Sequence, residues 1–362
     1  MPGSKCQLTY ISVLISLLAM TGGNQALAQP IHIDARPIPN FSASNPDRTL
    51  FGKFEYQAGL VLTSKSSDFG GFSGMMAGSN NNIIQAVSDQ GWFLHATLER
   101  SPSGKITGVT NAALTPILDN NGHRFNRKWK RDAETITSYS AGTNQVAIGF
   151  ENNVRIQIHG MSNKRPGRAL KTMSLQKLGR NRNGNATLEA LVSAPASNNS
   201  AAPEFLAIFE RKAKHDPGIP GWIMASGIAL PFWIQEHDSF AITEANLLSN
   251  GDLIILERRA SIFGGVQNRI RHILRSEIYA HNMLDGEVIF TAGSDNYTDN
   301  LEGMSTRIVK PNRCETLLVS DDNYSFLQNT ILLQFHWDCP TYKPASPVSF
   351  MMQKLLPHAR PN

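Results

Sequence analysis

Hydrophobic residues along this chain fall into short runs that are separated by clusters of turn residues. The C-terminal part shows the pattern best, with apolar runs at residues 301–309, 315–320 and 330–337. Runs of this length that are bounded by Pro, Asn and Asp are typical of β-strands. In an antiparallel pair, the start of one strand and the end of the next lie at the same edge of the sheet. We therefore expect Glu302 to lie beside the Asp321–Asp322 pair.

Five segments of the chain share this form. Each has a short apolar start, then a Ser or Glu, a strand, a turn and a second apolar strand that ends in a carboxylate. They read FSGMMAGSNNNIIQAVSD, AETITSYSAGTNQVAIGFE, LEALVSAPASNNSAAPEFLAIFE, TEANLLSNGDLIILE and LEGMSTRIVKPNRCETLLVSDD. The aligned first positions are Ser73, Glu134, Glu189, Glu244 and Glu302, and the aligned second positions are Asp89, Glu151, Glu210, Glu257 and Asp321. The aligned first positions are about 55–61 residues apart, and a period of this length is typical of β-propellers.

The repeat predicts an all-β fold, a β-propeller with five four-stranded blades. The last unit supplies three strands, so we expect residues 54–62 to add a fourth beside residues 330–337 and to close the ring. A sixth, degenerate blade within residues 165–185 or 212–236 is the alternative. Long amphipathic helical patterns, which an α/β fold needs, are absent from the sequence. A β-sandwich would not explain the regular period.

The N-terminal segment of the chain predicts export. Lys5, the apolar run at residues 8–20 and the small residues before position 28 form the pattern of a secretory signal peptide, with cleavage after Ala28. We interpret residues 29–48 as an extended lead-in, 49–342 as the propeller domain and 343–362 as a C-terminal tail. No other apolar stretch is long enough to cross a bilayer. The expected location is the periplasm or the medium.

The charge of the chain gives no sign of a polyanionic partner. Loss of Lys5 with residues 1–28 lowers the formal net charge from +5 to +4, and the basic residues are scattered. We therefore expect no nucleic acid to bind. One basic run, RFNRKWKR at residues 124–131, is typical of a solvated loop, with contact to an anion as the alternative.

Two cysteines, Cys314 and Cys339, remain after the signal peptide. Cys314 begins the second strand of the last unit and Cys339 ends the third, so antiparallel pairing brings them side by side. An even number of cysteines in an oxidising compartment favours a disulfide between them.

Carboxylates dominate the aligned positions, since nine of the ten are Asp or Glu. In a propeller these positions converge at one mouth of the central channel, where ionised acids repel one another unless a cation binds. Oxygen-rich clusters suit Ca²⁺. The candidate ligands of a divalent cation are Asp132, Glu151, Glu189, Asp321 and Asp322. The alternative is that each acid caps a turn or pairs with a nearby arginine, as Glu210 and Glu257 are placed to do.

Standard catalytic signatures are absent from the sequence, including G-x-S-x-G, H-E-x-x-H and the phosphate-binding glycine loop. Arginines that follow the second strands or lie on the third could grip an anion, since the guanidinium fork suits phosphate. These candidates are Arg155, Arg258, Arg259 and Arg269.

Several motifs together resemble the bacterial phytase-like family, which is described by its esterase-like activity. They are DAETI, FENNVRI, LEAL, GDLIILERR, DNLEGM and LLVSDDNYSFLQNTILLQF, and they extend over residues 70–335. The resemblance implies a β-propeller, export and a hydrolase.

The sequence and the resemblance together favour a metal-assisted hydrolase of a small-molecule ester, most consistent with a phosphate ester. Glu134 or Glu302 would activate water as general base, and Arg155 and Arg258 would neutralise the bound anion. We expect a monomer. Two alternatives stay open, a propeller that only binds a ligand or partner and a carboxylic esterase or lactonase.

Overall fold

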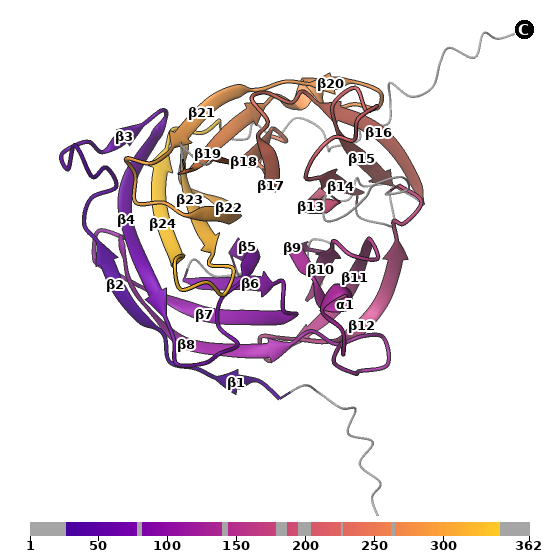
Figure 1. Ribbon diagram of the computed structural model, residues 1–362, viewed down its shortest axis with the longest axis horizontal. Coiled ribbons are helices and arrows are strands. Elements are labelled where there is room, and N and C mark those ends of the chain that lie inside the picture. Colours follow the sequence, from indigo (N-terminus) through magenta and orange to yellow (C-terminus); the bar gives the residue numbers. More distant parts are fainter. Residues whose placement is uncertain are drawn as a thin grey trace, which may run out of the picture.

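The computed structural model describes residues 27–77, 82–139, 144–178, 187–194, 204–225, 227–261 and 265–340. Five twisted sheets stand around one axis as the blades of a propeller (Figure 1). Within the described residues, helix is limited to α1 (Lys128–Arg131) and the 3-10 turn η1 (Arg275–Glu277). The predicted all-β propeller is confirmed, and it has five blades.

The blades are numbered in chain order, and their strands are given from the axis outward. Blade 1 has β5 (Phe72–Ala77), β6 (Ile83–Ser88), β7 (Trp92–Arg100), β8 (Ile106–Pro116) and β1 (Gln29–Pro30). Blade 2 has β9 (Ala133–Ser138), β10 (Gln145–Phe150), β11 (Arg155–Ser162) and β12 (Arg165–Ser174). Blade 3 has β13 (Leu188–Ala194), β14 (Glu204–Phe209), β15 (Ile219–Ala225), β16 (Ile228–Ile234) and β20 (Met283–Leu284).

Blade 4 has β17 (Ala241–Leu247), β18 (Leu253–Ser261), β19 (Gly265–Ile273) and β21 (Glu287–Ala292). Blade 5 has β22 (Asn300–Lys310), β23 (Arg313–Asp321), β24 (Thr330–Trp337), β4 (Phe54–Thr63) and β2 (Asp34–Ile38), with β3 (Leu50–Phe51) paired to β4. Each blade therefore keeps four strands in the order of the sequence, except blade 5, which takes its outer strands from the N-terminal part of the chain.

The ring closes as predicted, because β4 pairs with β24 in antiparallel register, with Leu62 opposite Thr330 and Tyr56 opposite Phe335. Strand β2 then covers the outer edge of β4. The alternative of a sixth blade is excluded for the described residues. Residues 165–174 form the outermost strand of blade 2, and residues 219–225 and 228–234 form two strands of blade 3.

Apolar side chains fill the spaces between neighbouring blades, one cluster for each pair. The cluster between blades 4 and 5 holds Phe54, Phe290 and Phe335, which are fully buried, and Phe54 stacks on Trp337 with ring centroids 5.1 Å apart. Removing each such ring from water contributes about 1.5–3 kcal/mol to folding. Successive side chains of a strand point to opposite faces of the sheet, so the continuous apolar runs place hydrophobic residues on both faces of each blade.

The inner strands approach one another closely at the axis. A Cβ atom at Gly74 would lie 2.7 Å from Thr135 Cα and 2.8 Å from Glu134 O, so only glycine fits where β5 meets β9. At Gly303, a Cβ atom would lie 3.0 Å from Met75 Cβ, where β22 meets β5. The channel of this propeller is therefore narrow, and side chains at the starts of the inner strands crowd together.

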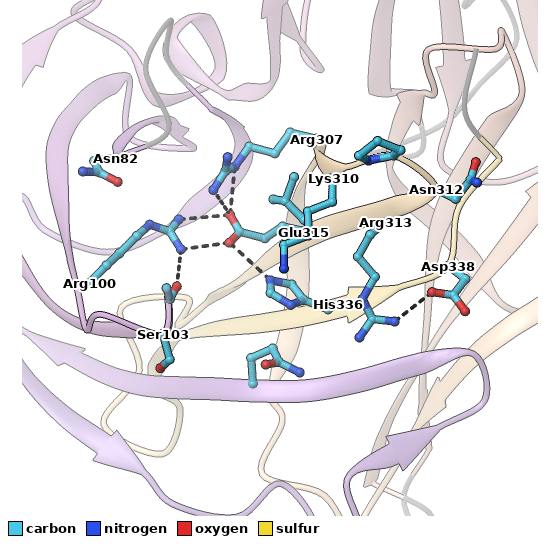
Figure 2. A pocket seen from close by; sticks show the side chains of 14 residues that line it. Asn82, Arg100, Ser103, Arg307, Lys310, Asn312, Arg313, Glu315, His336 and Asp338 are labelled. Atoms are coloured by element: carbon cyan, nitrogen blue, oxygen red, sulfur yellow. Dashed lines mark hydrogen bonds and ion pairs between the residues drawn. The ribbon is translucent and has the colours of Figure 1, made fainter. Parts of the chain in front are cut away.

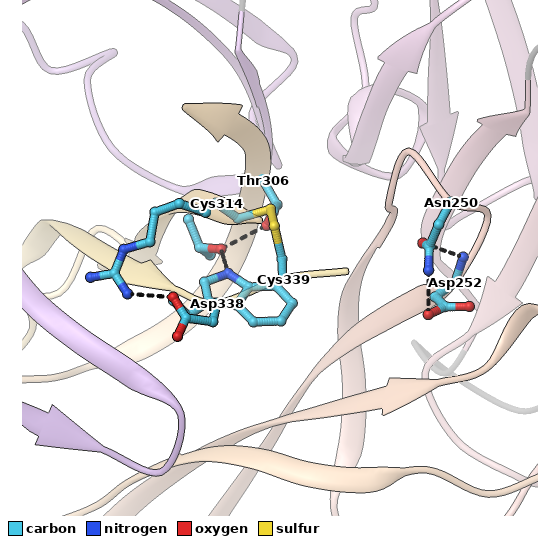
Figure 3. The surroundings of a disulfide bond; sticks show 9 residues. Asn250, Asp252, Thr306, Cys314, Asp338 and Cys339 are labelled. Carbon is cyan, nitrogen blue, oxygen red and sulfur yellow. Dashed lines mark hydrogen bonds and ion pairs between the residues drawn. A yellow bond between two sulfur atoms is a disulfide. The ribbon is translucent and has the colours of Figure 1, made fainter. Parts of the chain in front are cut away.

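Cys314 and Cys339 form the predicted disulfide, with Cα atoms 5.6 Å apart (Figure 3). Beside it, the Trp337 Nε1 donates to the Thr316 hydroxyl, which also shares a hydrogen bond with Thr306. The bond joins the second residue of β23 to Cys339, which lies two residues beyond the end of β24. It therefore fixes the end of β24, the strand on which the closing strand β4 pairs.

The predicted signal peptide spans residues 1–28, and its residues 1–26 lie outside the described part of the chain, as does the predicted tail at residues 343–362. The lead-in at residues 29–48 contributes β1 to blade 1 and β2 to blade 5. In the described part of the chain, no helix has the length and apolarity that a membrane crossing requires.

Candidate functional site

The candidate site lies at the face where each inner strand begins and the next strand ends, which we call the mouth. In every blade the register between these two strands shifts by one residue near the start of the inner strand. Such a bulge re-aims the side chain of the extra residue. The extra residues are Ser73, Glu134, Glu189, Thr243 and Glu302.

The second strands place one further residue each at the mouth. In blades 1, 2 and 3 the backbone N–H of this residue donates to a carbonyl just before the inner strand. In blades 4 and 5 the corresponding residues are paired with Ala241 and Asn300. The residues are Asp89, Glu151, Glu210, Arg258 and Asp321.

Blade 4 corrects the sequence alignment, which placed Glu244 and Glu257 at the mouth. The register puts Thr243 and Arg258 there instead, one residue along each strand. A shift of one residue turns a side chain to the other face of a strand. Blade 4 therefore contributes a hydroxyl and a cation where the other blades contribute mostly acids.

The two displaced glutamates are buried and serve other contacts. Glu257 accepts hydrogen bonds from Arg269 and Arg271, at 2.6 Å each, and none of its surface is exposed. Glu244 lies inside the ring of inner strands, where the Thr135 hydroxyl of blade 2 and its neighbour Ala245 N–H donate to it. Burial raises the pKa of Glu244 well above its usual range.

A group of three carboxylates on blade 2 could hold a metal ion. One oxygen from each of Asp132, Glu134 and Glu151 lies within 4.8 Å of the others, and all three side chains are buried. Asp132 precedes β9, Glu134 is its bulged residue and Glu151 follows β10. The bulge and the strand end therefore gather acids that are separated by up to 19 residues in sequence into one group.

One carboxylate oxygen of the triad has no hydrogen-bond donor among the described residues. Glu151 is 96% buried, and its Oε1 accepts no hydrogen bond within the described part of the chain. Leaving a buried polar atom without a partner is costly, and a cation would supply the missing interaction. The residues present therefore fit a divalent cation by the chemistry of their oxygens.

Burial and mutual repulsion hold these acids toward their neutral forms. Burial, followed by the charges of Asp132 and Glu210, raises the pKa of Glu151 to about 8. Burial, followed by the charges of Asp132, Glu302 and Glu151, raises the pKa of Glu134 well above its usual range. Ionisation of the triad is costly without a cation, so a bound cation could lower that cost.

Three more predicted residues, Glu189, Glu302 and Asp321, lie around the triad. Burial and the charges of Glu134, Glu151, Glu210 and Glu302 raise the pKa of Glu189, which is partly exposed. Burial, then the charge of Glu302, raises the pKa of Asp321 to about 8. The predicted proximity of Glu302 and Asp321 is therefore present in the structure.

Asp322 is held by the turn that follows β23. Its Oδ1 accepts hydrogen bonds from the backbone N–H groups of Gly71 and Tyr324, at 2.9 and 3.1 Å, and its Oδ2 accepts one from the Thr330 hydroxyl. These contacts tie blade 5 to the segment that enters blade 1. Its oxygens are already engaged, unlike the unsatisfied oxygen of Glu151.

Arg258 is the one predicted arginine whose guanidinium reaches the acids of the mouth. It lies 3.4 Å from Glu302 and 3.9 Å from Glu210, and it donates to Asn300. It therefore neutralises the side of the mouth that is formed by blades 3 and 5.

The other three predicted arginines are engaged in the framework. Arg155 stacks over the Phe150 ring at 3.9 Å and donates to the carbonyls of Lys130 and Asn152. Arg259 donates to the Asp238 carbonyl and to Gln267. Arg269 is bound to Glu257.

A basic cavity beside the triad is a feature that the sequence analysis gave only as an alternative, the contact of the basic run with an anion. It has a volume of about 470 Å³, and Arg124, Lys128 and Arg131 line it together with Asp89. Lys128 Nζ lies 3.4 Å from Asp89, and the Arg131 Nε is buried without a partner among the described residues. Arg131 directly precedes Asp132 in the sequence. Besides burial, the charges of Asp89, Lys128 and Arg131 act on the pKa of Asp132, so the cavity adjoins the first acid of the triad.

The signal for this cavity was the basic run at residues 124–131, which we interpreted as a solvated loop. Its final turn is α1, which leads from blade 1 into β9. The Arg124 guanidinium lies over the Trp92 ring, 4.1 Å from its centroid, and this contact holds the loop against blade 1. The run ends directly before the first acid of the triad, and that adjacency is the signal that was available.

The fold and the mouth define a five-bladed propeller with an acidic site at one end of its axis. Comparison with protein families agrees, because the family described as "Phytase-like: Esterase-like activity of phytase" matches residues 67–324. The chain belongs to this phytase-like family, as the sequence motifs predicted. No curated protein matches the chain.

Proposed function

We propose that this protein hydrolyses a phosphate ester with the help of a divalent cation at the mouth of the propeller. One observation carries the proposal: the buried, unsatisfied oxygen of Glu151 lies in an acid triad beside a cavity that is lined by Arg124, Lys128 and Arg131. Acids that would be stabilised by a cation therefore lie next to a cavity in which, among the described residues, three basic side chains face a single partly exposed ion pair, Lys128 with Asp89. A cation-bound phosphate group satisfies both.

Asp132, Glu134 and Glu151 are the residues that would hold the cation, with Glu189 and Asp321 at its outer side. A bound divalent cation, for which we propose Ca²⁺, polarises the phosphoryl oxygens and neutralises charge that develops during the reaction. Asp322, whose oxygens are engaged by the turn, would fix the wall of the site.

The substrate phosphate would lie against Arg124, Lys128 and Arg131, with Arg258 on the other side of the mouth. Arginine forks bind phosphate oxygens in pairs, and Lys128 adds a point charge. Arg155, Arg259 and Arg269 would support the walls, because their guanidinium groups are already engaged.

Glu302 is our candidate for the general base. It is partly exposed at the mouth, and Asn300 Nδ2 donates to its Oε1 at 2.8 Å, which fixes the orientation of the carboxylate. Burial raises its pKa, which moves a carboxylate toward the range that general bases use at neutral pH. Glu134 is the alternative base, with a cation held by the other acids.

We also propose that the protein acts outside the cytoplasm as a monomer. The disulfide between Cys314 and Cys339 supports an oxidising compartment. The small volume of the basic cavity supports a small-molecule substrate rather than a macromolecule.

An activity panel tests the proposal. Protein treated with EDTA should hydrolyse p-nitrophenyl phosphate only after Ca²⁺ or another divalent cation is added, and p-nitrophenyl acetate slowly or not at all. Glu151→Gln should remove the response to the cation, whereas Glu99→Gln, which changes an exposed acid at the far end of β7, should leave it intact. Faster hydrolysis of the acetate would favour a carboxylic esterase instead.

The basic cavity has its own matched pair of variants. Arg124→Ala should raise the KM for p-nitrophenyl phosphate about tenfold, because it removes a charge-assisted hydrogen bond to the substrate. Arg127→Ala changes an exposed arginine of the same loop that does not line the cavity, and it should leave KM unchanged. Lack of any hydrolysis, together with tight ligand binding, would favour a propeller that only binds.

A further inference from the structure

A second cavity, of about 920 Å³, lies on the face opposite the mouth. Figure 2 shows the side chains that line it. Strand β22 begins at the mouth with Asn300 and ends at Lys310, and β7 ends at Arg100 on the same far side. The cavity lies where blade 5 meets blade 1. It is therefore separated from the triad by the length of the inner strands.

Basic side chains prevail in this cavity. Among the described residues that line it are Arg100, Arg307, Lys310 and Arg313, but only two acids, Glu315 and Asp338. His336 adds a further nitrogen-bearing ring. The lining therefore carries an excess of positive charge even before any histidine is protonated.

One buried carboxylate organises two of the guanidinium groups. Glu315 is 2% exposed, and it accepts hydrogen bonds from Arg100 at 2.8 and 3.0 Å and from Arg307 at 2.9 Å. Burial alone would raise the pKa of Glu315, but hydrogen bonds and charges from His336, Arg100 and Arg307 lower it to about 2. Two fixed cations thus share one anion, which leaves a net positive charge at the base of the cavity.

The rim adds cations that are held less firmly. Arg313 Nη1 donates to Asp338 at 2.9 Å, and its other arm reaches Glu55, but both acids are exposed to solvent. Lys310 is exposed and forms no ion pair with any residue of the described ranges. Exposed ion pairs contribute little, so these two cations can turn to a ligand at small cost.

We propose that this cavity binds a small organic molecule that carries two or more oxyanion groups, phosphate or carboxylate. The preorganised Arg100–Glu315–Arg307 group would meet one oxyanion, and Lys310 and Arg313 would meet another at the rim. The volume is near the upper end for small-molecule sites and exceeds what a single inorganic phosphate fills.

The ligand would bridge the closure of the ring. Gln57 on β4, His336 on β24 and Arg100 on β7 all line the cavity, and they come from the N-terminal strand, the C-terminal strand and blade 1. A ligand that binds only this closed arrangement raises stability as its concentration rises. Binding on this face would therefore be visible in unfolding experiments even if it never affected hydrolysis.

Titration with pyrophosphate, citrate and inorganic phosphate at constant ionic strength tests the proposal, with calorimetry and the unfolding temperature as readouts. Pyrophosphate or citrate should bind at least ten times more tightly than inorganic phosphate and should raise the unfolding temperature. Tighter binding of pyrophosphate identifies a phosphorylated ligand, and tighter binding of citrate a polycarboxylate. If neither anion binds more tightly than inorganic phosphate, the proposal is wrong.

Variants locate the binding. Lys310→Ala combined with Arg313→Ala should weaken it about tenfold or more, whereas Lys171→Ala, an exposed lysine on β12 of blade 2, should not. Arg124→Ala should leave this binding unchanged, because Arg124 belongs to the cavity beside the triad. Equal affinity in the Lys310/Arg313 variant and the wild type would overturn the proposal while leaving the proposed hydrolase untouched.

Discussion

The Arg258 guanidinium lies 3.4 Å from the Glu302 carboxylate, and it is the residue that blade 4 places at the mouth in line with the acids of the other blades. It neutralises Glu302 and approaches Glu210, but it makes no ion pair with the triad of blade 2 within the described residues. A cation should therefore bind on the blade 2 side of the mouth.

Replacement of Arg258 tests this division of charge. Arg258→Met should lower the unfolding temperature in EDTA and should increase the rise that Ca²⁺ produces, because Glu302 loses its counter-ion and Glu210 keeps only Arg211, at 3.3 Å. Arg259→Met is the matched control, since Arg259 contacts Asp238 and Gln267 instead. Its effect should be the same with and without Ca²⁺. A Ca²⁺ response of Arg258→Met equal to that of the wild type would contradict the assignment.

The raised pKa values at the mouth predict that cation binding releases protons. Glu151 and Asp321 have pKa values of about 8, so at pH 7 the cation-free carboxyl groups carry protons that a cation must displace. Affinity for Ca²⁺ should rise with pH up to that value. Calorimetry in two buffers of different ionisation enthalpy measures the protons released, and Glu151→Gln should reduce their number. Binding heats independent of the buffer would refute this.

The same shifts fix the direction of the pH dependence of stability. A carboxyl group whose pKa rises on folding stabilises the folded state below its ordinary pKa, and this contribution is lost as pH rises through the folded value. In EDTA, the free energy of unfolding should therefore fall between about pH 4.5 and pH 8 through these groups. Saturating Ca²⁺ should flatten that fall. Urea unfolding at several pH values, with and without Ca²⁺, provides the measurement.

The disulfide predicts a loss of stability on reduction. Cys314 and Cys339 are 25 residues apart, and a loop of that length contributes about 3–4 kcal/mol by restricting the unfolded chain. The double variant Cys314→Ser/Cys339→Ser should unfold at a correspondingly lower urea concentration. Thiol titration of the denatured, unreduced protein should find no reactive thiol from this pair, and two would argue against the bond.

Glu257 should behave as a framework residue despite its place in the sequence repeat. Glu257→Ala leaves the buried Arg269 and Arg271 with only the exposed Asp238 and Asp285 as acidic partners, which costs about 3–5 kcal/mol of stability. Asp285→Asn, which removes an exposed partner of Arg271, should cost less than about 1 kcal/mol. Neither change should alter the rise in unfolding temperature that Ca²⁺ produces. A Ca²⁺ response lost in Glu257→Ala would place this acid at the mouth after all.

The fold was accessible from sequence because its determinants are local and repeated. Each unit carries the same order of apolar strand, turn and apolar strand, and the three strands of the last unit required a fourth. Pairing of Cys314 with Cys339 followed from the same hairpin geometry. These patterns depend on strand length and turn chemistry, which a single sequence displays.

The candidate site was accessible only in part, because a bulge is not visible in a sequence. Asp132, Glu134 and Glu151 were all singled out, since the repeat in blade 2 aligns correctly. In blade 4 the pairs Thr243–Glu244 and Glu257–Arg258 each offer an acid one residue away from the mouth position, and the alignment followed the acids. The cavity of Arg124 and Arg131 depends on how the segment between blades 1 and 2 packs, which is a tertiary property.

Pairing of β4 with β24 makes the two ends of the chain a single element in folding. Strand β4 is synthesised early, but its partner β24 is synthesised near the end, so blade 5 cannot form until almost all the described chain is available. Such long-range pairing is slow, and until it forms, the edge of β4 stays open to wrong partners. A chain that ended before β24 would therefore lose its N-terminal strand as well, so late truncations should be as damaging as early ones.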